Sequence, residues 1–588
     1  MIRALVLTTL LASVAPAHAV NDTLLTLSER SGFLKTGRYD EVIALCDAFA
    51  KAYPDAVRCF DFGITPEGRP MKALAVSRSG VLTPEAARSS GLPVVLVQGG
   101  IHAGEIDGKD AGFLALRQVL DGEAAKGALD KQVLVFVPVF NIDGHERFGR
   151  WNRPNQNGPE EMGWRTTAEN FNLNRDYVKA DAPEMQAMLA LVNQWDPVAT
   201  IDLHVTNGAK FEHDISIQVE PLHSGDPELR KAGRMLRNGV IADLTTQGSL
   251  PLAFYPAFVD FEDPTTGFVD SVPPPRFSHG YFPLRNRLGM LVETHSWKDY
   301  PTRVRITRNA VVSVLDVMAR HGKQWHEFAR EADARAVKLA GTSVPVEYTA
   351  SDKTRTIDFR GYAYTRTPSE VSGALMTRYD DSKPQTWKVP LRDEIVVGRT
   401  IVAPRGGYLV PRQYAVDVAR QLSIHGIQFR TLDRALTDAN VEIFHAEKTT
   451  LTPNSVEGHQ RLTVEGSWKP ETQSTPAGAL FVPIAQPKLR LVMAILEPQS
   501  SDSLLAWGDF NNAFEQKEYM EAYVAEDVAR DMLGRDPALK AEFERKLMSD
   551  AVFAKSPQAR LEFFARRHSS WDDRFNRYPV FRIQDVPN

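Results

Sequence analysis

Residues 93–110 read PVVLVQGGIHAGEIDGKD. The first part is a continuous apolar run, which is typical of a strand buried on both faces of a sheet. Two glycines end the run, and His102 and Glu105 follow them three residues apart. A strand that only has to end needs a turn, not a soft base and a carboxylate held together in a loop of small residues. The stretch therefore predicts a buried strand with a chemically active loop at its carboxyl end.

Similar apolar runs occur at 133–141, 198–205 and 288–295. A helical pattern at 107–120 lies between the runs at 93–99 and 133–141, and another at 183–195 lies between the runs at 133–141 and 198–205. The second helix has a proline in its first turn. Doubly buried strands that alternate with helices predict an α/β fold with a mixed, mostly parallel central sheet flanked by helices.

Polar side chains able to bind a metal or move protons lie where these strands end. His102 and Glu105 follow one strand, His204 closes a second, and Glu293 closes a third. Ligands bind at the carboxyl ends of strands in open α/β sheets. Two histidines and a carboxylate are a usual protein set for catalytic Zn²⁺, which leaves one position for water. We therefore predict His102, Glu105 and His204 as ligands of one zinc ion, with Glu293 as the general base.

The sequence also predicts side chains that orient the metal-binding histidines, and a pair of residues that binds the carboxylate of the substrate. Asp202 and Asp143 are candidates to orient the histidines. The stretch ENFNLNRDY places Asn174 beside Arg175. An arginine fork binds a carboxylate through two hydrogen bonds, and an amide adds another. The glycines around His102 are expected to let a cation and an incoming amide approach the backbone closely.

Taken together, these motifs resemble the M14 zinc carboxypeptidases of the carboxypeptidase A type, over residues 40 to 320. HAGE resembles the family's His-x-x-Glu pair, NIDG its Asn-Pro-Asp-Gly turn, NLNRD its carboxylate-binding pair, DLH its third ligand and LVETH its catalytic glutamate. The resemblance implies that Arg165, in GWRTT, stabilises the oxyanion, although Arg150 and Arg153 lie in the same loop. It also implies a mobile substrate-binding tyrosine, for which Tyr281 is the first choice and Tyr255 the second.

The sequence departs from the family at one place. Ala103 and Gly104 stand where the family often carries an arginine, so one substrate contact lacks its usual side chain. The acidic residues of loop 254–278 have two interpretations. They suit a specificity pocket for a basic substrate side chain, and they also fit a solvent-exposed acidic loop.

The predicted organisation has four parts. Residues 1–19 read as a cleaved signal peptide, with Arg3, an apolar run and a small-residue cleavage pattern. The zinc peptidase domain follows at 20–335, then a β-rich accessory domain at 336–515 and a helical docking segment at 516–588. The protein is expected to be exported, periplasmic or secreted from a bacterium. Cys46 and Cys59 are either disulfide-bonded or two buried thiols.

The predicted function is zinc-dependent removal of C-terminal amino acids from peptides, with a metal-bound water as nucleophile. The alternatives are an N-acyl amino acid deacylase similar to aspartoacylase, a carboxypeptidase acting on peptidoglycan peptides, and an inactive binding protein. The partner is a peptide or peptide-like substrate with a free carboxylate. The net charge of −5 gives no sign of a nucleic-acid partner, and no stable membrane span is expected.

Overall fold

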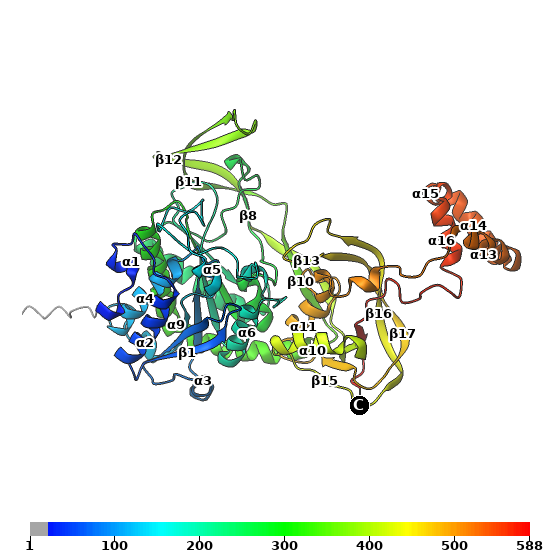
Figure 1. Cartoon of the computed structure of the whole chain (residues 1–588), viewed down its shortest axis with the longest axis horizontal. Coiled ribbons are helices and arrows are strands. Elements are labelled where there is room, and N and C mark those ends of the chain that lie inside the picture. Colours follow the sequence, from blue (N-terminus) through cyan, green and yellow to red (C-terminus); the bar gives the residue numbers. More distant parts are fainter. Residues whose placement is uncertain (1–21, 588) are drawn as a thin grey trace, which may run out of the picture.

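The computed structural model describes residues 22–587, so the predicted signal peptide at 1–19 lies outside the described residues. An N-terminal region (residues 22–339) holds the largest sheet. An accessory region (residues 343–515 and 577–587) packs beside it, and a small helical unit (residues 522–565) projects from the accessory region (Figure 1).

The sheet of the N-terminal region has eight strands. In spatial order they are β1 (Val57–Ile64), β2 (Pro70–Val76), β4 (Val133–Val137), β3 (Val94–Gly99), β5 (Ala199–Val205), β9 (Leu288–Thr294), β6 (Ile215–Glu220) and β7 (Pro251–Leu252). The central strands β4, β3, β5 and β9 run parallel, and antiparallel neighbours flank them. This confirms the predicted mixed, mostly parallel sheet, and all four apolar runs form its centre.

Helices pack around this sheet. The main ones are α2 (Tyr39–Ala52), α3 (Pro84–Ser90), α4 (Asp107–Leu120), α6 (Pro183–Trp195), α7 (Pro227–Thr246) and α9 (Tyr300–Ala336). Both α4 and α7 lie beside the long helix α9. Three short helices, α1 (Leu27–Arg30), α5 (Ile142–Glu146) and α8 (Ser278–Tyr281), lie in the connections. A disulfide joins Cys46 in α2 to Cys59 in β1, which decides the question that the sequence left open.

The accessory region is built from antiparallel strands. Its six-stranded sheet contains, in spatial order, β15 (Arg430–Thr431), β18 (Leu480–Pro483), β14 (Gly407–Val410), β19 (Phe581–Ile583), β16 (Leu436–Leu451) and β17 (Leu462–Thr475). Two further pairs are β10 (Ser343–Ala350) with β13 (Ile395–Val402) and the long hairpin of β11 (Arg355–Pro368) with β12 (Leu375–Arg392). The end of β12 pairs with β8 (Phe268–Val269) of the N-terminal region. Helices α10 (Ala415–Ile424), α11 (Leu489–Leu496) and α12 (Leu504–Trp507) complete the region.

The helical unit has a small core of its own. It comprises α13 (Ala522–Arg535), α14 (Pro537–Ser549), α15 (Ala551–Lys555) and α16 (Pro557–Ala565). Phe543, Phe553 and Phe564 pack together inside it. After it the chain returns to the accessory region, where β19 lies between β14 and β16. The helical segment expected over 516–588 therefore ends before its last residues, because the apolar stretch around Phe581 pairs as a strand.

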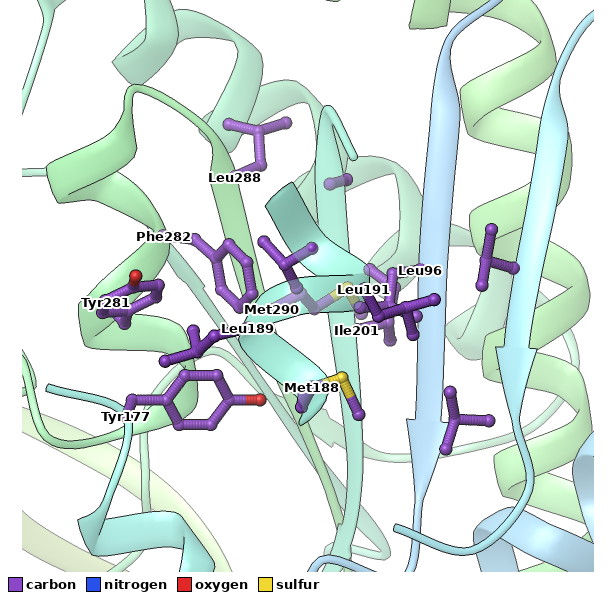
Figure 2. Packing of buried hydrophobic residues seen from close by; sticks show 14 of the residues in the cluster. Leu96, Tyr177, Met188, Leu189, Leu191, Ile201, Tyr281, Phe282, Leu288 and Met290 are labelled. Carbon is purple, nitrogen blue, oxygen red and sulfur yellow. The ribbon is translucent and has the colours of Figure 1, made fainter. Parts of the chain in front are cut away.

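One continuous buried cluster extends from the N-terminal sheet into the accessory region. It contains strand residues such as Val97 and Ile201 together with Tyr408 and Val482 of the accessory sheet. Figure 2 shows part of it, where Tyr177, Tyr281 and Phe282 meet Leu189 and Met290. The two regions therefore share apolar packing.

Candidate metal centre and active site

Three adjacent parallel strands bring the predicted ligands together. Gly99 on β3 pairs with Leu203 on β5, and His204 on β5 pairs with Glu293 on β9. The loop after β3 carries His102 and Glu105 to the same edge. One ligand atom from each of His102, Glu105 and His204 lies within 4.8 Å of the others. The convergence predicted from the strand ends is thus present.

The three side chains face one another through the atoms that a metal would use. His102 Nδ1 lies 3.0 Å from Glu105 Oε1, and His204 Nδ1 lies 2.9 Å from Glu105 Oε2. All three residues are at most 4% exposed. Two imidazole nitrogens and a carboxylate are the donor types of catalytic zinc sites. Because buried donors of these types converge on one place, the residues fit a zinc ion.

The outward nitrogens of the two histidines have different partners. His204 Nε2 lies 2.8 Å from the carboxylate of Asp202, and His102 Nε2 lies 3.0 Å from the amide oxygen of Asn172. Asp202 thus has the orienting place predicted for it. Asp143 does not, because its carboxylate accepts hydrogen bonds from Thr65 and Arg69. Asn172 was missed, although it lies two residues before Asn174 in the same motif.

Glu293 is a buried acid beside the ligand set. It is 7% exposed, and its Oε2 has no hydrogen-bond partner among the described residues. Burial raises its pKa to about 8; His204 acts in the opposite direction, and the carboxylates of Glu105 and Asp202 raise the pKa further. A carboxyl group that can hold a proton near neutral pH is suited to proton transfer.

Two arginines reach the carboxylate of Glu105. Arg153 Nη1 lies 3.0 Å from Glu105 Oε1, and Arg165 Nη1 lies 3.5 Å from the same atom. The Arg153 side chain is 7% exposed and that of Arg165 is 34% exposed. Arg165 is therefore at the site and accessible. Arg153, which the sequence offers only as an alternative to Arg165 for stabilising the oxyanion, is the more buried of the two.

Arg153 also explains one of the loop glycines. A Cβ atom on Gly104 would overlap the Arg153 side chain and lie 2.8 Å from the carbonyl oxygen of Gly163. The expectation that this glycine makes room for a cation and an amide is therefore corrected. It makes room for protein atoms, and a guanidinium from another loop lies beside the HAGE motif.

Asn174 lies close to the predicted ligands, with its Nδ2 3.4 Å from His204 Nε2, and Arg175 follows it in the chain. Asn174 Oδ1 accepts a hydrogen bond from the backbone of Ser278, and Arg175 Nη1 donates to the carbonyl of Asn174. The Arg175 guanidinium lies 4.1 Å from the centre of the Phe277 ring. Burial, and next the charge of Arg165, lowers the pKa of Arg175 to about 10. Over residues 22–587 no carboxylate lies within ion-pair distance of Arg175, so the guanidinium can accept one from a substrate.

The prediction that Tyr281 binds substrate is wrong. Its side chain is fully buried in the apolar cluster of Figure 2, and its hydroxyl lies 2.8 Å from His425 Nδ1 in the accessory region. Apolar neighbours on a short helix drive this ring into the core. Tyr255 is less buried than Tyr281, and its pKa is raised by burial and then by the charges of Glu293 and Glu105. The second choice is therefore within electrostatic range of these two acids.

The acids of loop 254–278 do not form one pocket. Asp263 is ion-paired with Arg366 of the hairpin β11–β12. Asp260 and Glu262 are exposed, whereas Asp270 is partly buried near His223 and Arg237. The loop therefore combines solvated acids with a contact to the accessory region.

Parts of this chain are similar in sequence to known carboxypeptidases. Residues 42–211 match the family model for zinc carboxypeptidases, Peptidase_M14. Carboxypeptidase B of Helicoverpa zea is 29% identical over 24% of this chain and 35% of its own length. Carboxypeptidase 2 of Trichophyton tonsurans is 23% identical over 75% of this chain and 78% of its own length. The inactive metallocarboxypeptidase ECM14 of Saccharomyces cerevisiae is 31% identical over 21% of this chain and 30% of its own length.

Among solved structures, carboxypeptidase A of Helicoverpa armigera has a TM-score of 0.34 at 15% identity, covering 51% of this chain and 74% of that one. A metallo-carboxypeptidase of Burkholderia cenocepacia has a TM-score of 0.35 at 16% identity, and the match covers 47% of this chain and 68% of that one. The family match includes the loop with His102 and Glu105, the pair Asn174 and Arg175, and the strand with His204. Over residues 42–211 the chain is therefore similar to the zinc carboxypeptidase family, and it spans about a third of the length of the carboxypeptidase B that it matches.

Proposed function

We propose that the protein is a zinc-dependent carboxypeptidase that removes C-terminal amino acids from peptides. One observation carries the proposal: His102, Glu105 and His204 converge at the ends of adjacent strands, with Glu293 paired beside His204. The guanidinium of Arg175, which has no ion pair within residues 22–587, gives the site a place for a terminal carboxylate.

One Zn²⁺ per chain would be held by His102, Glu105 and His204. When bound, it polarises a carbonyl group as a Lewis acid and lowers the pKa of a water molecule that it contacts. The carboxylate of Asp202 and the amide oxygen of Asn172 lie beside the outward Nε2 atoms of His204 and His102. An Nε2 proton can be donated to each of them, so each Nδ1 would be available to hold the ion.

The remaining steps belong to the residues of the chain. Asn174 and Arg175 bind the terminal carboxylate and so fix the scissile bond in position. Glu293 takes a proton from the attacking water and returns it to the nitrogen of the leaving amine. Arg165 donates hydrogen bonds to the carbonyl oxygen as negative charge develops there. Tyr255, whose pKa is raised in part by the charge of Glu293, is the proposed substrate-contacting tyrosine.

A substrate panel tests this function against its alternatives. Peptides with a free C-terminus, the same peptides with a C-terminal amide, N-acyl amino acids and peptidoglycan stem peptides would be incubated with the enzyme. We expect stepwise loss of C-terminal residues from the free peptides, abolished by a zinc chelator and restored by added Zn²⁺. Hydrolysis of N-acyl amino acids alone would contradict the proposal and favour a deacylase. Activity restricted to stem peptides would narrow the substrate class to the cell wall.

We propose that the enzyme works outside the cytoplasm, and this rests only on the signal-like residues 1–19. No helix within residues 22–587 is long and apolar enough to cross a membrane. The test is to locate the full-length chain after fractionation and to sequence its mature N-terminus. A new N-terminus near residue 20 is expected, and an uncleaved cytoplasmic chain would contradict export.

A further inference from the structure

Loop 253–267 joins β7 to β8 and carries Tyr255. Its first part is attached beside the active site, because Ser216 Oγ donates a 2.6 Å hydrogen bond to the carbonyl of Phe254. Ser216 on β6 is the register partner of Glu293 on β9. Register partners on antiparallel strands point to the same face of a sheet. The backbone of Phe254, and with it the neighbouring Tyr255, therefore lies on the face to which Glu293 points.

The far part of this loop is attached to the hairpin β11–β12 of the accessory region. Figure 1 shows this hairpin extending away from the rest of the molecule. The guanidinium of Arg366 on β11 pairs with the carboxylate of Asp263. Thr377 Oγ1 on β12 donates a 2.7 Å hydrogen bond to the carbonyl of Glu262. Arg366 and Thr377 are register partners in the hairpin, so together they hold the loop at one place.

The end of the loop is built against the base of the same hairpin. Strand β8 pairs in parallel with the end of β12, where Phe268 lies opposite Leu391. Gly267, which has φ of +67°, approaches β12 so closely that a Cβ atom there would overlap the carbonyl oxygen of Pro390. The hairpin therefore fixes the loop at two separate places along its length.

These contacts enclose a small apolar cluster that is separate from the large cluster of the sheet. The N-terminal region supplies Phe211, Leu252, Phe258 and Phe268, and the hairpin supplies Phe359, Trp387, Val389 and Leu391. The ring centre of Phe268 lies 4.8 Å from that of Phe359, and the ring centre of Phe258 lies 6.1 Å from that of Trp387. Without the hairpin these loop rings would lose apolar partners that shield them from water, so the order of the loop depends on the hairpin.

We propose that Arg366 and Thr377 are positioning residues, which hold loop 253–267 in the conformation that places Tyr255 at the substrate before any substrate is bound. This inference rests on the proposed carboxypeptidase function. A loop that is already ordered loses little conformational freedom when substrate binds, whereas a loose loop must be ordered at the expense of affinity. Among the described residues, the hydrogen bonds of both side chains go to the loop alone. Their effect is therefore on substrate binding and not on the zinc ligands.

The test measures KM and kcat for a peptide with a free C-terminus. Arg366→Gln and Thr377→Val each remove one contact with the loop. We expect KM to rise about threefold in each variant and about tenfold in the double variant, with kcat within about twofold of wild type and zinc content unchanged. Lys388→Gln is the matched control, because it removes an ion pair with Asp358 inside the same hairpin. The control should leave KM unchanged.

A double-mutant cycle with Tyr255→Phe separates positioning from general destabilisation. If the hairpin acts through the Tyr255 hydroxyl, adding Arg366→Gln to Tyr255→Phe should raise KM by less than about 1.5-fold. The full threefold rise in that background would overturn the inference, because the hairpin would then act on substrate by another route.

Amide hydrogen exchange over residues 253–267 tests the inference without substrate. Exchange should be faster in the Arg366→Gln, Thr377→Val double variant than in wild type or Lys388→Gln, because the loop opens more often. Unchanged exchange, or an unchanged KM in the folded, zinc-loaded double variant, would overturn the inference and leave the carboxypeptidase function intact. A wild-type enzyme that cleaves no peptide would overturn the proposed function, and this inference with it.

Discussion

The two sheets of this molecule place their polar residues in different ways. In the N-terminal region, β3, β5 and β9 are parallel neighbours, so their carboxyl ends bring His102, Glu105, His204 and Glu293 to one edge. In the accessory sheet every described pairing is antiparallel, and the hairpin tip between β16 and β17 makes its contact with the segment that follows Arg175, where His459 pairs with Asp181. The first sheet thus gathers polar side chains through the topology of its strands, whereas the second presents them on a turn.

The largest effect should come from the acid on β9. Glu293→Gln keeps the shape of the side chain and removes its ability to take a proton, so kcat should fall by about 10²–10⁴-fold. Zinc content, measured by atomic emission, should not change. Glu228→Gln, on the surface of α7, is the control and should retain full activity. An active Glu293→Gln enzyme would remove the base from the mechanism.

A smaller effect is expected from the residues behind the histidines. Asp202→Asn replaces the carboxylate behind His204 with an amide, so zinc should bind about 10–100-fold more weakly. Asn172→Asp makes the reverse change behind His102 and should tighten zinc binding. Competition with a chromogenic chelator measures both affinities. Equal affinities in the two variants would show that these contacts do not tune the ligands.

The accessory region should affect substrate binding and leave the chemistry alone. Asp502→Asn weakens the hold on Arg276 and thereby on Phe277, the ring beside Arg175. We expect KM for free-carboxylate peptides to rise about three- to tenfold, as for loss of one charge-assisted hydrogen bond. Zinc affinity should be unchanged, and Asp393→Asn, which removes a surface ion pair with Arg355, is the control. A fall in kcat at constant KM would contradict this division of labour.

The smallest effect concerns a second buried acid of the N-terminal region. Neither carboxylate oxygen of Glu184 has a hydrogen-bond partner among the described residues, and burial raises its pKa from 4.5 to about 7. The ionised form is therefore disfavoured in the fold, and the free energy of unfolding should fall as pH rises from about 4.5 to 7. Glu184→Gln should be more stable than wild type by about 1–2 kcal/mol at pH 8 and equally stable at pH 4. Urea denaturation of the wild type and Glu184→Gln at both pH values measures the difference in the free energy of unfolding. Identical unfolding curves for the two proteins at pH 8 would contradict the prediction.

Much of the first sheet and its site was predictable from the sequence. The strands are unbroken apolar runs, and a residue that follows such a run is constrained to one edge of a parallel sheet. His102, Glu105, His204 and Glu293 follow from that rule. The positions of Asn172 and Arg153 could not be predicted by this rule. Both lie in loops, where no periodicity indicates which way a side chain points. Tyr281 was misplaced since its motif gave no measure of burial.

The contact between the β16–β17 hairpin tip and the N-terminal region was not predictable from the sequence, for a different reason. It joins residues more than 270 positions apart, as shown by the ion pair between Asp181 and His459. The N-terminal region uses short βα connections, whose geometry is repeated in many proteins. The docking of two regions depends on many side chains at once, and no local pattern in either region specifies it.

The central claim is that His102, Glu105 and His204 bind one zinc ion, and anomalous diffraction at the zinc edge tests it most directly. Crystals of the zinc-loaded protein should show one strong peak per chain, about 2.0–2.2 Å from both Nδ1 atoms and the Glu105 carboxylate. That peak should vanish in His204→Ala. A peak at another group of residues, or an active enzyme without any peak, would contradict the account.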